Sequence, residues 1–336
     1  MVKDRVENIK MLNFLFCYDS NYNKQAEVAM YSILENVSEK ININIIHQTD
    51  KVKNLIPNII KEHRNLGKLI IYEFKRPKNI KFENLANVHV TEATYYRLFI
   101  SNYLDKSINN LVYVDCDIVC VDDLTLNLKN KLLTLNKSQE IIAAVPEYKN
   151  IKEIQLFHNE LKLKNNDYFN AGVMLIDFKK WNENNVGSKL LETLISLKGK
   201  IQYWDQDVMN KFFDGHYLKL EDSYNKKFTN NNELNRKIIS DIEDNNSDIF
   251  LIHFAGKFKP WHVNGAVVNG SELFHNIFYK LNTYQPYIQI YNRRNALKQL
   301  VSLKFIKDLK IKKNKFSIIF NVFRSIMFKG VHKDEV

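Results

Sequence analysis

The sequence is poor in cysteine, glycine and proline, and it has no long apolar run. Three cysteines in 336 residues, an odd number, argue against a disulfide framework and favour a reducing compartment. Nine glycines and five prolines are too few for a repetitive β architecture or for long flexible linkers. No stretch reaches the roughly 18 to 20 apolar residues that a membrane-spanning helix needs. Because the charged first ten residues also lack the apolar core of a signal peptide, we expect a cytoplasmic protein.

The common nucleotide-binding motifs are missing as well. Neither G-x-G-x-x-G nor G-x-x-x-x-G-K-[ST] occurs, which excludes the usual dinucleotide and P-loop sites. The net charge of +11 is concentrated in residues 293–336, where twelve Lys or Arg face three acidic residues and give +9. Residues 1–292 therefore carry only +2. A near-neutral body with a cationic extension is not typical of a nucleic-acid-binding surface, so no nucleic-acid partner is expected.

Apolar residues make up 45% of the chain, which is enough for a sizeable core, and predicted strands alternate with predicted helices. This alternation indicates an α/β fold with a parallel or mixed sheet covered by helices on both faces. Asn-rich residues 225–246 are expected to form a loop or irregular region. The predicted strands cover 11–19, 41–47, 68–74, 111–121, 141–145, 168–176 and 249–254, and the predicted helices cover 24–36, 52–63, 91–104, 178–197 and 206–213.

Two carboxylates, Asp115 and Asp117, interrupt the apolar run of the strand predicted over 111–121. Side chains two residues apart point to the same face of a strand, so both carboxylates can reach one ion. Hard carboxylate oxygens suit Mg²⁺ or Mn²⁺, and an ion held by so few protein groups usually binds substrate phosphates too. The pattern favours a nucleotide-using enzyme. The alternative is a pair of solvated carboxylates at the end of a strand.

Six short segments, found in order within residues 11–262, resemble the family 8 glycosyltransferases, which have the GT-A fold. The segments YFNAGVMLIDFKKW and DQDVMN, with the basic C-terminal tail, are most similar to the bacterial lipopolysaccharide core glucosyl- and galactosyltransferases. The resemblance implies a GT-A catalytic domain over 1–285, with a mixed, mostly parallel sheet, and a basic helical membrane-association region over 286–336. The six segments are Asp19–Tyr22, Tyr95–Leu98, Tyr113–Val119, Tyr168–Val173, Asp205–Asp207 and His253–Trp261.

The resemblance also implies a metal site and a diphosphate site. Asp115, Asp117 and His253 would hold Mn²⁺ or Mg²⁺. Lys259 would pair with the diphosphate of the donor, and Gly256 would let the backbone come close to it. A histidine at the end of a strand is alternatively a hydrogen-bonded structural residue.

For the UDP-sugar itself, the resemblance implies contacts from the N-terminal loop, from residues 97 and 170–171, and from the DQD segment. The expected catalytic residues are Gln206, near the reacting anomeric carbon, with Asp205 and Arg97. Two of them have a simpler alternative: Arg97 as a surface side chain and Asp205 as the N-cap of helix 206–213. The expected UDP-sugar contacts are Cys17, Asp19, Asn21, Arg97, Asp115, Cys116, Asn170, Ala171, Asp205, Gln206, Gly256 and Lys259.

The C-terminal tail combines helical apolar spacing with basic flanks. Phe316, Ile319, Phe320, Phe323 and Met327 recur at a period near 3.6 residues. This pattern predicts a basic amphipathic helix on an anionic membrane surface. A helix packed on the body of the protein is the alternative.

Taken together, the resemblance implies a retaining enzyme that moves glucose or galactose from UDP-glucose or UDP-galactose to a sugar hydroxyl of a lipopolysaccharide or lipooligosaccharide core. We expect it at the cytoplasmic face of the bacterial inner membrane, with a lipid-linked oligosaccharide as acceptor. Alternatives are another cell-surface glycan or glycoprotein as acceptor, an inactive sugar-binding protein recruited to the membrane, or a nucleotidyltransferase. The last would need a Gly-rich basic phosphate loop, which residues 19–22 do not supply.

Overall fold

The chain divides by its internal contacts into two compact units. Unit 1 comprises residues 1–116 and 122–225, and unit 2 comprises 117–121 and 226–336. The boundary at 285 between a catalytic domain and a membrane-association region stays a prediction. No helix among the described residues is long and apolar enough to cross a membrane. The computed structural model describes residues 9–78, 80, 82, 91–147, 159–165, 167–197, 199–228, 231–244, 246–256, 259–266, 268–281, 287–290, 292–305, 320 and 322–327.

Unit 1 is built on a seven-stranded mixed sheet in the order β3-β2-β1-β4-β7-β6-β8. β7 alone runs against the other strands, because it pairs antiparallel with both β4 and β6 while every other neighbouring pair is parallel. The sheet is therefore mixed and mostly parallel, as predicted. Its strands are β1 (Asn13–Tyr18), β2 (Ile41–His47), β3 (Leu66–Glu73), β4 (Asn110–Val114), β6 (Ile142–Pro146), β7 (Phe169–Asp177) and β8 (Leu218–Lys219).

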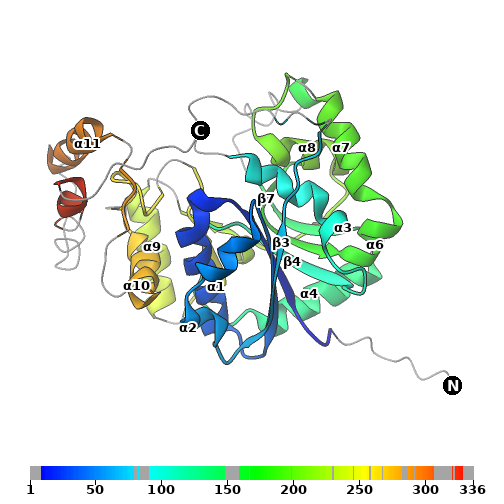
Figure 1. The fold of residues 1–336 in the computed structure, drawn as a ribbon, viewed down its shortest axis with the longest axis horizontal. Coiled ribbons are helices and arrows are strands. Elements are labelled where there is room, and N and C mark those ends of the chain that lie inside the picture. The colour runs from blue at the N-terminus through cyan, green and yellow to red at the C-terminus, as the bar shows by residue number, and fades with distance from the viewer. Residues whose placement is uncertain are drawn as a thin grey trace. The chain divides into compact units, whose positions relative to one another are not determined.

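Helices lie on both faces of this sheet. Figure 1 shows α1 and α2 on one side, with α3, α6 and α7 on the other. The second side is filled by a large apolar cluster that includes Tyr95, Tyr113, Phe169 and Trp181, all fully buried. The helices of unit 1 are η1 (Ser20–Tyr22), α1 (Asn23–Asn36), η2 (Asp50–Asn54), α2 (Asn58–Lys61), η3 (Glu92–Phe99), α3 (Ile100–Tyr103), α4 (Thr125–Lys137), α6 (Phe178–Glu183), α7 (Val186–Ser196), α8 (Trp204–Phe213) and η4 (Asp222–Tyr224).

Because β7 runs in the opposite direction to its neighbours β4 and β6, its first residues lie beside the last residues of those two strands. Val114, the last residue of β4, lies opposite Val173, and the amide of Asp115 donates to the carbonyl of Gly172 at 2.8 Å. Ligands of open α/β sheets bind at the carboxyl ends of the parallel strands. The start of β7 therefore contributes Asn170 and Ala171 to the same edge.

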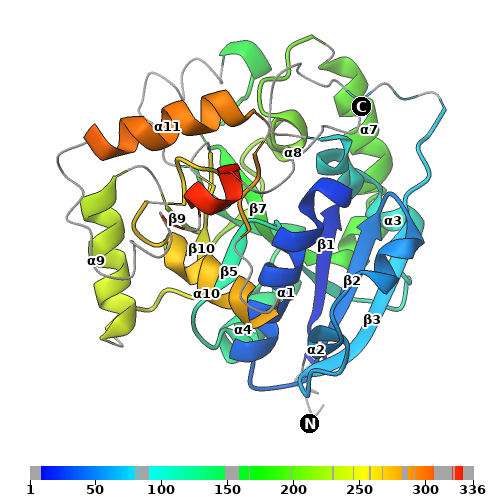
Figure 2. The ribbon, with the colours of Figure 1, turned by 60° about the vertical axis from the view of Figure 1, so that its left-hand side comes forward.

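Unit 2 contains a three-stranded sheet in the order β5-β10-β9 and a separate apolar cluster. In that cluster Ala296 and Leu300 of the tail are buried with Val263, Ala266 and Ile288. Figure 2 shows the three strands with α9, α10 and α11. The elements are β5 (Ile118–Cys120), β9 (Lys226–Lys227), α9 (Asn232–Glu243), β10 (Leu251–His253), α10 (Ser271–Leu281) and α11 (Arg293–Phe305).

The strand predicted over 111–121 is wrong as a single element. β4 ends at Val114 and β5 begins at Ile118, and the two strands belong to different sheets. Residues 115–117 form the connection, so the expected placement of Asp115 and Asp117 on one strand face is also wrong. The residues on both sides of the connection are apolar, and this continuous apolar pattern predicted one strand where the structure has two.

The loop predicted over 225–246 is also wrong, because this segment contains α9. The side chain of Asn231 caps the helix by accepting from the amides of Glu233 and Leu234, while Ile238 and Ile239 are buried. The polar asparagines that suggested a loop are thus partly the cap and the exposed face of a helix.

Two predicted helices are broken by local backbone chemistry. Pro57 separates η2 from α2 within the helix predicted over 52–63, because proline disfavours helical geometry in the residue before it. Asn185, with φ of 52°, separates α6 from α7 within the helix predicted over 178–197. The helix predicted over 91–104 is mostly the 3₁₀ segment η3.

His275 of α10 predicts an acid sensitivity in unit 2. The side chain is 2% exposed, and its Nε2 hydrogen-bonds the carbonyl of Pro260 at 2.9 Å. Burial lowers the pKa of His275 to about 4, against the opposing effect of that hydrogen bond. The unfolded chain therefore binds this proton more tightly than the folded protein does. The contribution of neutral His275 to the free energy of unfolding, on the order of 3 kcal/mol, is complete above about pH 6.5 and is lost as the pH falls towards 4.

The variant His275→Gln removes the titrating group but keeps a donor for Pro260. We expect its free energy of unfolding, measured in urea at pH 5 and pH 7.5, to depend less on pH than that of the wild type. Exposed His216 supplies the control variant His216→Gln, which should keep the wild-type dependence. An unchanged dependence in His275→Gln would contradict this assignment.

Candidate functional site

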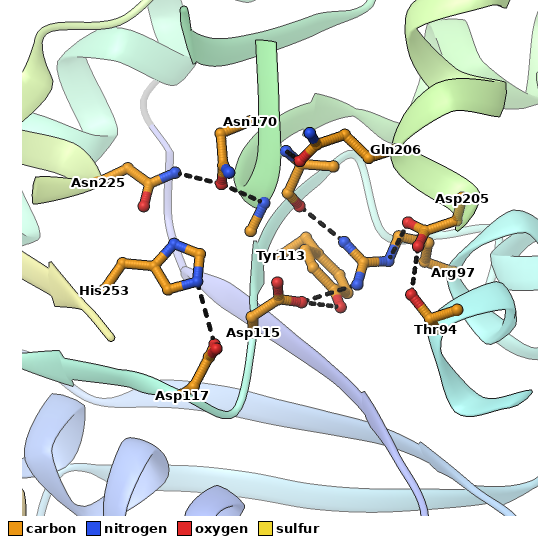
Figure 3. A network of polar contacts seen from close by, with 12 residues as sticks. Thr94, Arg97, Tyr113, Asp115, Asp117, Asn170, Asp205, Gln206, Asn225 and His253 are labelled. Atoms are coloured by element: carbon orange, nitrogen blue, oxygen red, sulfur yellow. Dashed lines mark hydrogen bonds and ion pairs between the residues drawn. The ribbon is translucent and has the colours of Figure 1, made fainter. Parts of the chain in front are cut away.

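The centre of the site in unit 1 is the guanidinium of Arg97, on η3. Its Nη2 donates to Asp115 and its Nη1 donates to the carbonyl of Ala171, each at 2.7 Å. Its Nε lies 3.0 Å from a carboxylate oxygen of Asp205, and its plane lies over the ring of Tyr113, 4.1 Å from the ring centroid. Figure 3 shows these contacts. With 6% of its surface exposed, Arg97 is a buried ion-pairing residue, and the alternative of a surface side chain is wrong.

A register shift in β7 makes backbone groups available to this arginine. Ala144 lies opposite Met174, but the next residue, Val145, lies opposite Asn170, so β7 has an excess of residues at this step. Such bulges release backbone groups from the ladder. Here the amide of Ala171 donates to Gln206 Oε1 at 3.0 Å, and its carbonyl accepts from Arg97.

The charges in this network are unequal in number, with one guanidinium for two carboxylates. Burial alone would lower the pKa of Arg97, but Asp115 and Asp205 outweigh it and raise that pKa, so the guanidinium stays charged. Burial raises the pKa of Asp205 to about 6, although Arg97 and a hydrogen bond from the hydroxyl of Thr94 oppose the rise.

Asp205 is not the N-cap that the sequence predicted. α8 begins at Trp204, and the side chain of its N-cap residue, Tyr203, makes no capping hydrogen bond. The carboxylate of Asp207 accepts from the amides of Gln202 and Tyr203 instead, each at 2.7 Å. Asp205 lies inside the helix, where its carboxylate pairs with Arg97 and accepts a hydrogen bond from Thr94.

Next to this network, the side chains of Asn170 and Gln206 are held by defined partners. Asn170 accepts from the amide of Gly172 and from the side chain of Asn225, and it donates to Glu147 at 2.9 Å. Gln206 Nε2 donates to the hydroxyl of Tyr168 at 3.3 Å. The side chains of these two predicted contact residues are thus held in place by hydrogen bonds within the protein.

The N-terminal loop follows the end of β1. Asp19 is buried, and its carboxylate accepts from the amide of Asn21 at 3.0 Å, which caps the short helix η1. Asp19 and Asn21 therefore belong to a hydrogen-bonded turn. Cys17 and Cys116 are also buried, and burial raises the pKa of the Cys17 thiol.

Asp117 is the centre of a second network, in unit 2. Its carboxylate lies 3.2 Å from His253 Nε2 and accepts from the Lys259 ammonium, which also donates to the carbonyl of Phe254 at 2.8 Å. Burial would raise the pKa of Asp117, but Lys259 and His253 outweigh it and hold that pKa well below its usual range. Gly256, with φ of 76°, has a backbone conformation that other residues rarely adopt.

The three predicted metal ligands form a candidate ligand group. One carboxylate oxygen each from Asp115 and Asp117 and one ring nitrogen of His253 lie within 4.8 Å of one another. Two hard carboxylates with one imidazole form a donor set that fits Mn²⁺ or Mg²⁺. The side chains present therefore fit a divalent cation.

Several residues of the two networks were missed by the sequence predictions. Tyr113, Tyr168 and Asp207 lie inside the recognised segments, and Tyr113 is two residues before Asp115. That spacing alone could have indicated a shared direction of their side chains. Thr94 and Asn225 carried no signal, since each acts through a partner distant in the sequence, Asp205 and Asn170.

Comparison with known proteins gives one family model that matches, Glycosyl transferase family 8, over residues 13–265. A lipopolysaccharide 1,2-glucosyltransferase of Escherichia coli K12 is 30% identical over 265 residues, which cover 77% of this chain and 76% of that protein. A lipopolysaccharide 1,3-galactosyltransferase of Salmonella typhimurium is 30% identical over 183 residues, covering 52% and 51%.

Among solved structures, the galactosyltransferase LgtC, in complex with donor and acceptor sugar analogues, matches with a TM-score of 0.62 and 20% identity. The match covers 81% of this chain and 96% of that one. The likeness confirms the predicted GT-A fold. Because the family model covers most of the chain, the protein belongs to glycosyltransferase family 8.

Proposed function

We propose that this glycosyltransferase moves glucose or galactose from a UDP-sugar to a hydroxyl of a lipopolysaccharide or lipooligosaccharide core, with retention of anomeric configuration. The observation that carries the proposal is the ion-paired array of Asp115, Arg97 and Asp205 at the carboxyl end of the sheet. Asp115 is two residues before Asp117 in the sequence. The acceptor class is proposed because relatives named above act on lipopolysaccharide. The alternatives are another cell-surface glycan or a glycoprotein.

The donor diphosphate would be neutralised by a divalent cation and by Lys259. Asp115, Asp117 and His253 would hold Mn²⁺ or Mg²⁺, which when bound supplies Lewis-acid stabilisation of the departing diphosphate. Lys259 is already held near Asp117 by the carbonyl of Phe254, so its ammonium is oriented before the donor binds. Such preorganised charge is effective because it needs no rearrangement as the leaving group departs.

The hexose would lie against β7 and α8. Asp205 offers carboxylate oxygens for sugar hydroxyls, and Asn170 and Ala171 would line the pocket. Cys17, Asp19 and Asn21, at the end of β1, would contact the uracil and its neighbouring groups. Arg97 would support the sugar pocket by fixing Asp205 and the Ala171 carbonyl in place.

Retention is assigned to front-face attack by the acceptor hydroxyl, with the leaving phosphate oxygen as the base. An amide is a poor nucleophile, and the amide oxygen of Gln206 already accepts from Ala171. Gln206 would therefore act near the anomeric carbon as a polar contact.

The donor and the metal are tested by release of UDP from a panel of UDP-sugars without acceptor. We expect slow hydrolysis of one UDP-hexose with Mn²⁺ and loss of that hydrolysis with EDTA, because the metal neutralises the leaving diphosphate. The variant Asp117→Asn removes a ligand charge and should lower the rate at least tenfold.

An exposed surface residue provides the control, since Glu39→Gln should leave the rate of UDP release unchanged. If no UDP-sugar is hydrolysed and calorimetry detects no binding of UDP with Mn²⁺, the proposed activity is wrong.

We also propose that the tail attaches the enzyme to the cytoplasmic face of the bacterial inner membrane. Within unit 2, Val322 and Ile326 are buried in the apolar cluster with α11, so part of the tail packs on its own unit, as the alternative prediction held. Phe320, Phe323 and Met327 are 65%, 44% and 46% exposed. In the sequence these three apolar side chains follow the basic segment 304–315, and both features favour an anionic bilayer. Phe316 and Ile319, also predicted for this face, lie outside the described residues.

Membrane attachment is tested by substitution of the exposed side chains, because truncation after Tyr291 would strip Leu300 and Ile326 from the apolar cluster. The triple variant Phe320→Ser, Phe323→Ser, Met327→Ser should lose sedimentation with anionic vesicles while it keeps UDP release.

The control is Leu126→Ser, which removes a side chain that is 70% exposed on α4 and should leave sedimentation unchanged. Unaltered vesicle binding of the triple variant would show that these side chains are not the anchor.

A further inference from the structure

The side-chain amide of Gln206 is held at both ends in unit 1. Its oxygen accepts from the amide of Ala171 at 3.0 Å, and its nitrogen donates to the hydroxyl of Tyr168 at 3.3 Å. An amide side chain has two nearly identical orientations, so the partners at its two ends decide which atom points where. At a residue next to the reacting sugar, that choice decides whether a donor or an acceptor is presented.

The proton of the Tyr168 hydroxyl is committed to Asp207. The carboxylate of Asp207 accepts from this hydroxyl at 2.5 Å and from the amides of Gln202 and Tyr203 at 2.7 Å. A carboxylate has no proton to give, so all three partners must donate to it. The Tyr168 oxygen can then only accept from Gln206.

It follows that Asp207 and Tyr168 direct the Gln206 amide nitrogen to the Tyr168 side and its oxygen to Ala171. The reverse orientation would place two donors face to face at Ala171 and two acceptors face to face at the Tyr168 oxygen. Mismatches of buried polar groups are unfavourable, so the observed orientation is strongly preferred.

The backbone at the start of α8 also indicates that this arrangement is functional. Trp204, the residue before Asp205, has φ of 46°, a left-handed conformation that is unfavourable for a residue other than glycine. The two amides that donate to Asp207 belong to Gln202 and Tyr203, the residues just before Trp204. Asp207 therefore stabilises the strained turn. Strain of this kind concentrates at functional sites.

We propose that Asp207 and Tyr168 are positioning residues that fix the orientation of the Gln206 amide, and with it the directions in which the remaining N–H and the remaining oxygen lone pair can meet the donor sugar. The inference rests on the proposed function, since it needs Gln206 to contact the sugar. Neither positioning residue needs to touch the substrate.

A double-mutant cycle tests the inference. Tyr168→Phe removes the hydroxyl that holds the amide nitrogen, and we expect kcat for the UDP-hexose to fall roughly tenfold with KM changed less than about twofold. Gln206→Ala should lower kcat at least as much. Because Tyr168 acts through Gln206, Tyr168→Phe should have no further effect on kcat in the Gln206→Ala background.

Asp207→Asn provides a second route to the same test. Its new amide group can donate to the Tyr168 oxygen, which frees the hydroxyl proton to point at Gln206 and favours the reversed amide. We expect the kcat of this variant to fall to about the level of Tyr168→Phe, and again with no further loss in the Gln206→Ala background.

The matched control is Tyr217→Phe, since Tyr217 is a buried tyrosine of the same cluster whose ring packs on Phe169 at 4.9 Å. It should keep wild-type kcat with a melting temperature close to that of Tyr168→Phe. Additive losses in the cycles would overturn the positioning role while leaving the proposed function intact. Absence of UDP-hexose turnover in the wild type would overturn the proposed function itself.

Discussion

The buried guanidinium of Arg97 is the interaction on which the site in unit 1 depends. Taking a charged group out of water costs several kcal/mol unless it is paired and hydrogen-bonded. Arg97 meets that requirement with Asp115, Asp205 and the carbonyl of Ala171, and with the ring of Tyr113. The planar guanidinium can serve these partners in different directions at once, which a lysine ammonium on its flexible stem cannot do. The arginine therefore sets the geometry of both carboxylates.

The balance of charge also favours a cationic partner. One guanidinium for two carboxylates, of which Asp205 is buried and Asp115 is partly exposed, leaves a net negative charge at a residue two positions before Asp117. Burial resists this surplus, which is visible in the raised pKa of Asp205. A divalent cation that shares Asp115 and Asp117 would reduce the surplus. The repulsion between the two carboxylates would thus contribute to binding of a metal and its diphosphate.

The sequence could point to a candidate site because the residues with the relevant chemistry lie in short, recognisable segments. Asp115, Asp117 and His253 were predicted as metal ligands, and the structure brings their ligand atoms together. The connections between residues were harder to predict. A bulge in β7 turns the backbone of Ala171 towards Arg97 and Gln206, and nothing in the local sequence specifies that register shift. The errors at residues 111–121 and 225–246 have one cause: apolar or polar composition was taken for an element, while pairing partners and a single cap decide where elements begin and end.

The most direct test of this account is the affinity of UDP with Mn²⁺, measured by calorimetry on the wild type and on Arg97→Lys. The substitution keeps the positive charge but removes the fork that holds Asp115, Asp205 and Ala171 together. The account predicts at least a tenfold weaker binding, with cooperative thermal unfolding retained. The control Arg76→Lys, at an exposed arginine paired with Glu92, should bind like the wild type. Wild-type affinity in Arg97→Lys would contradict the claim that the geometry of this one side chain organises the site.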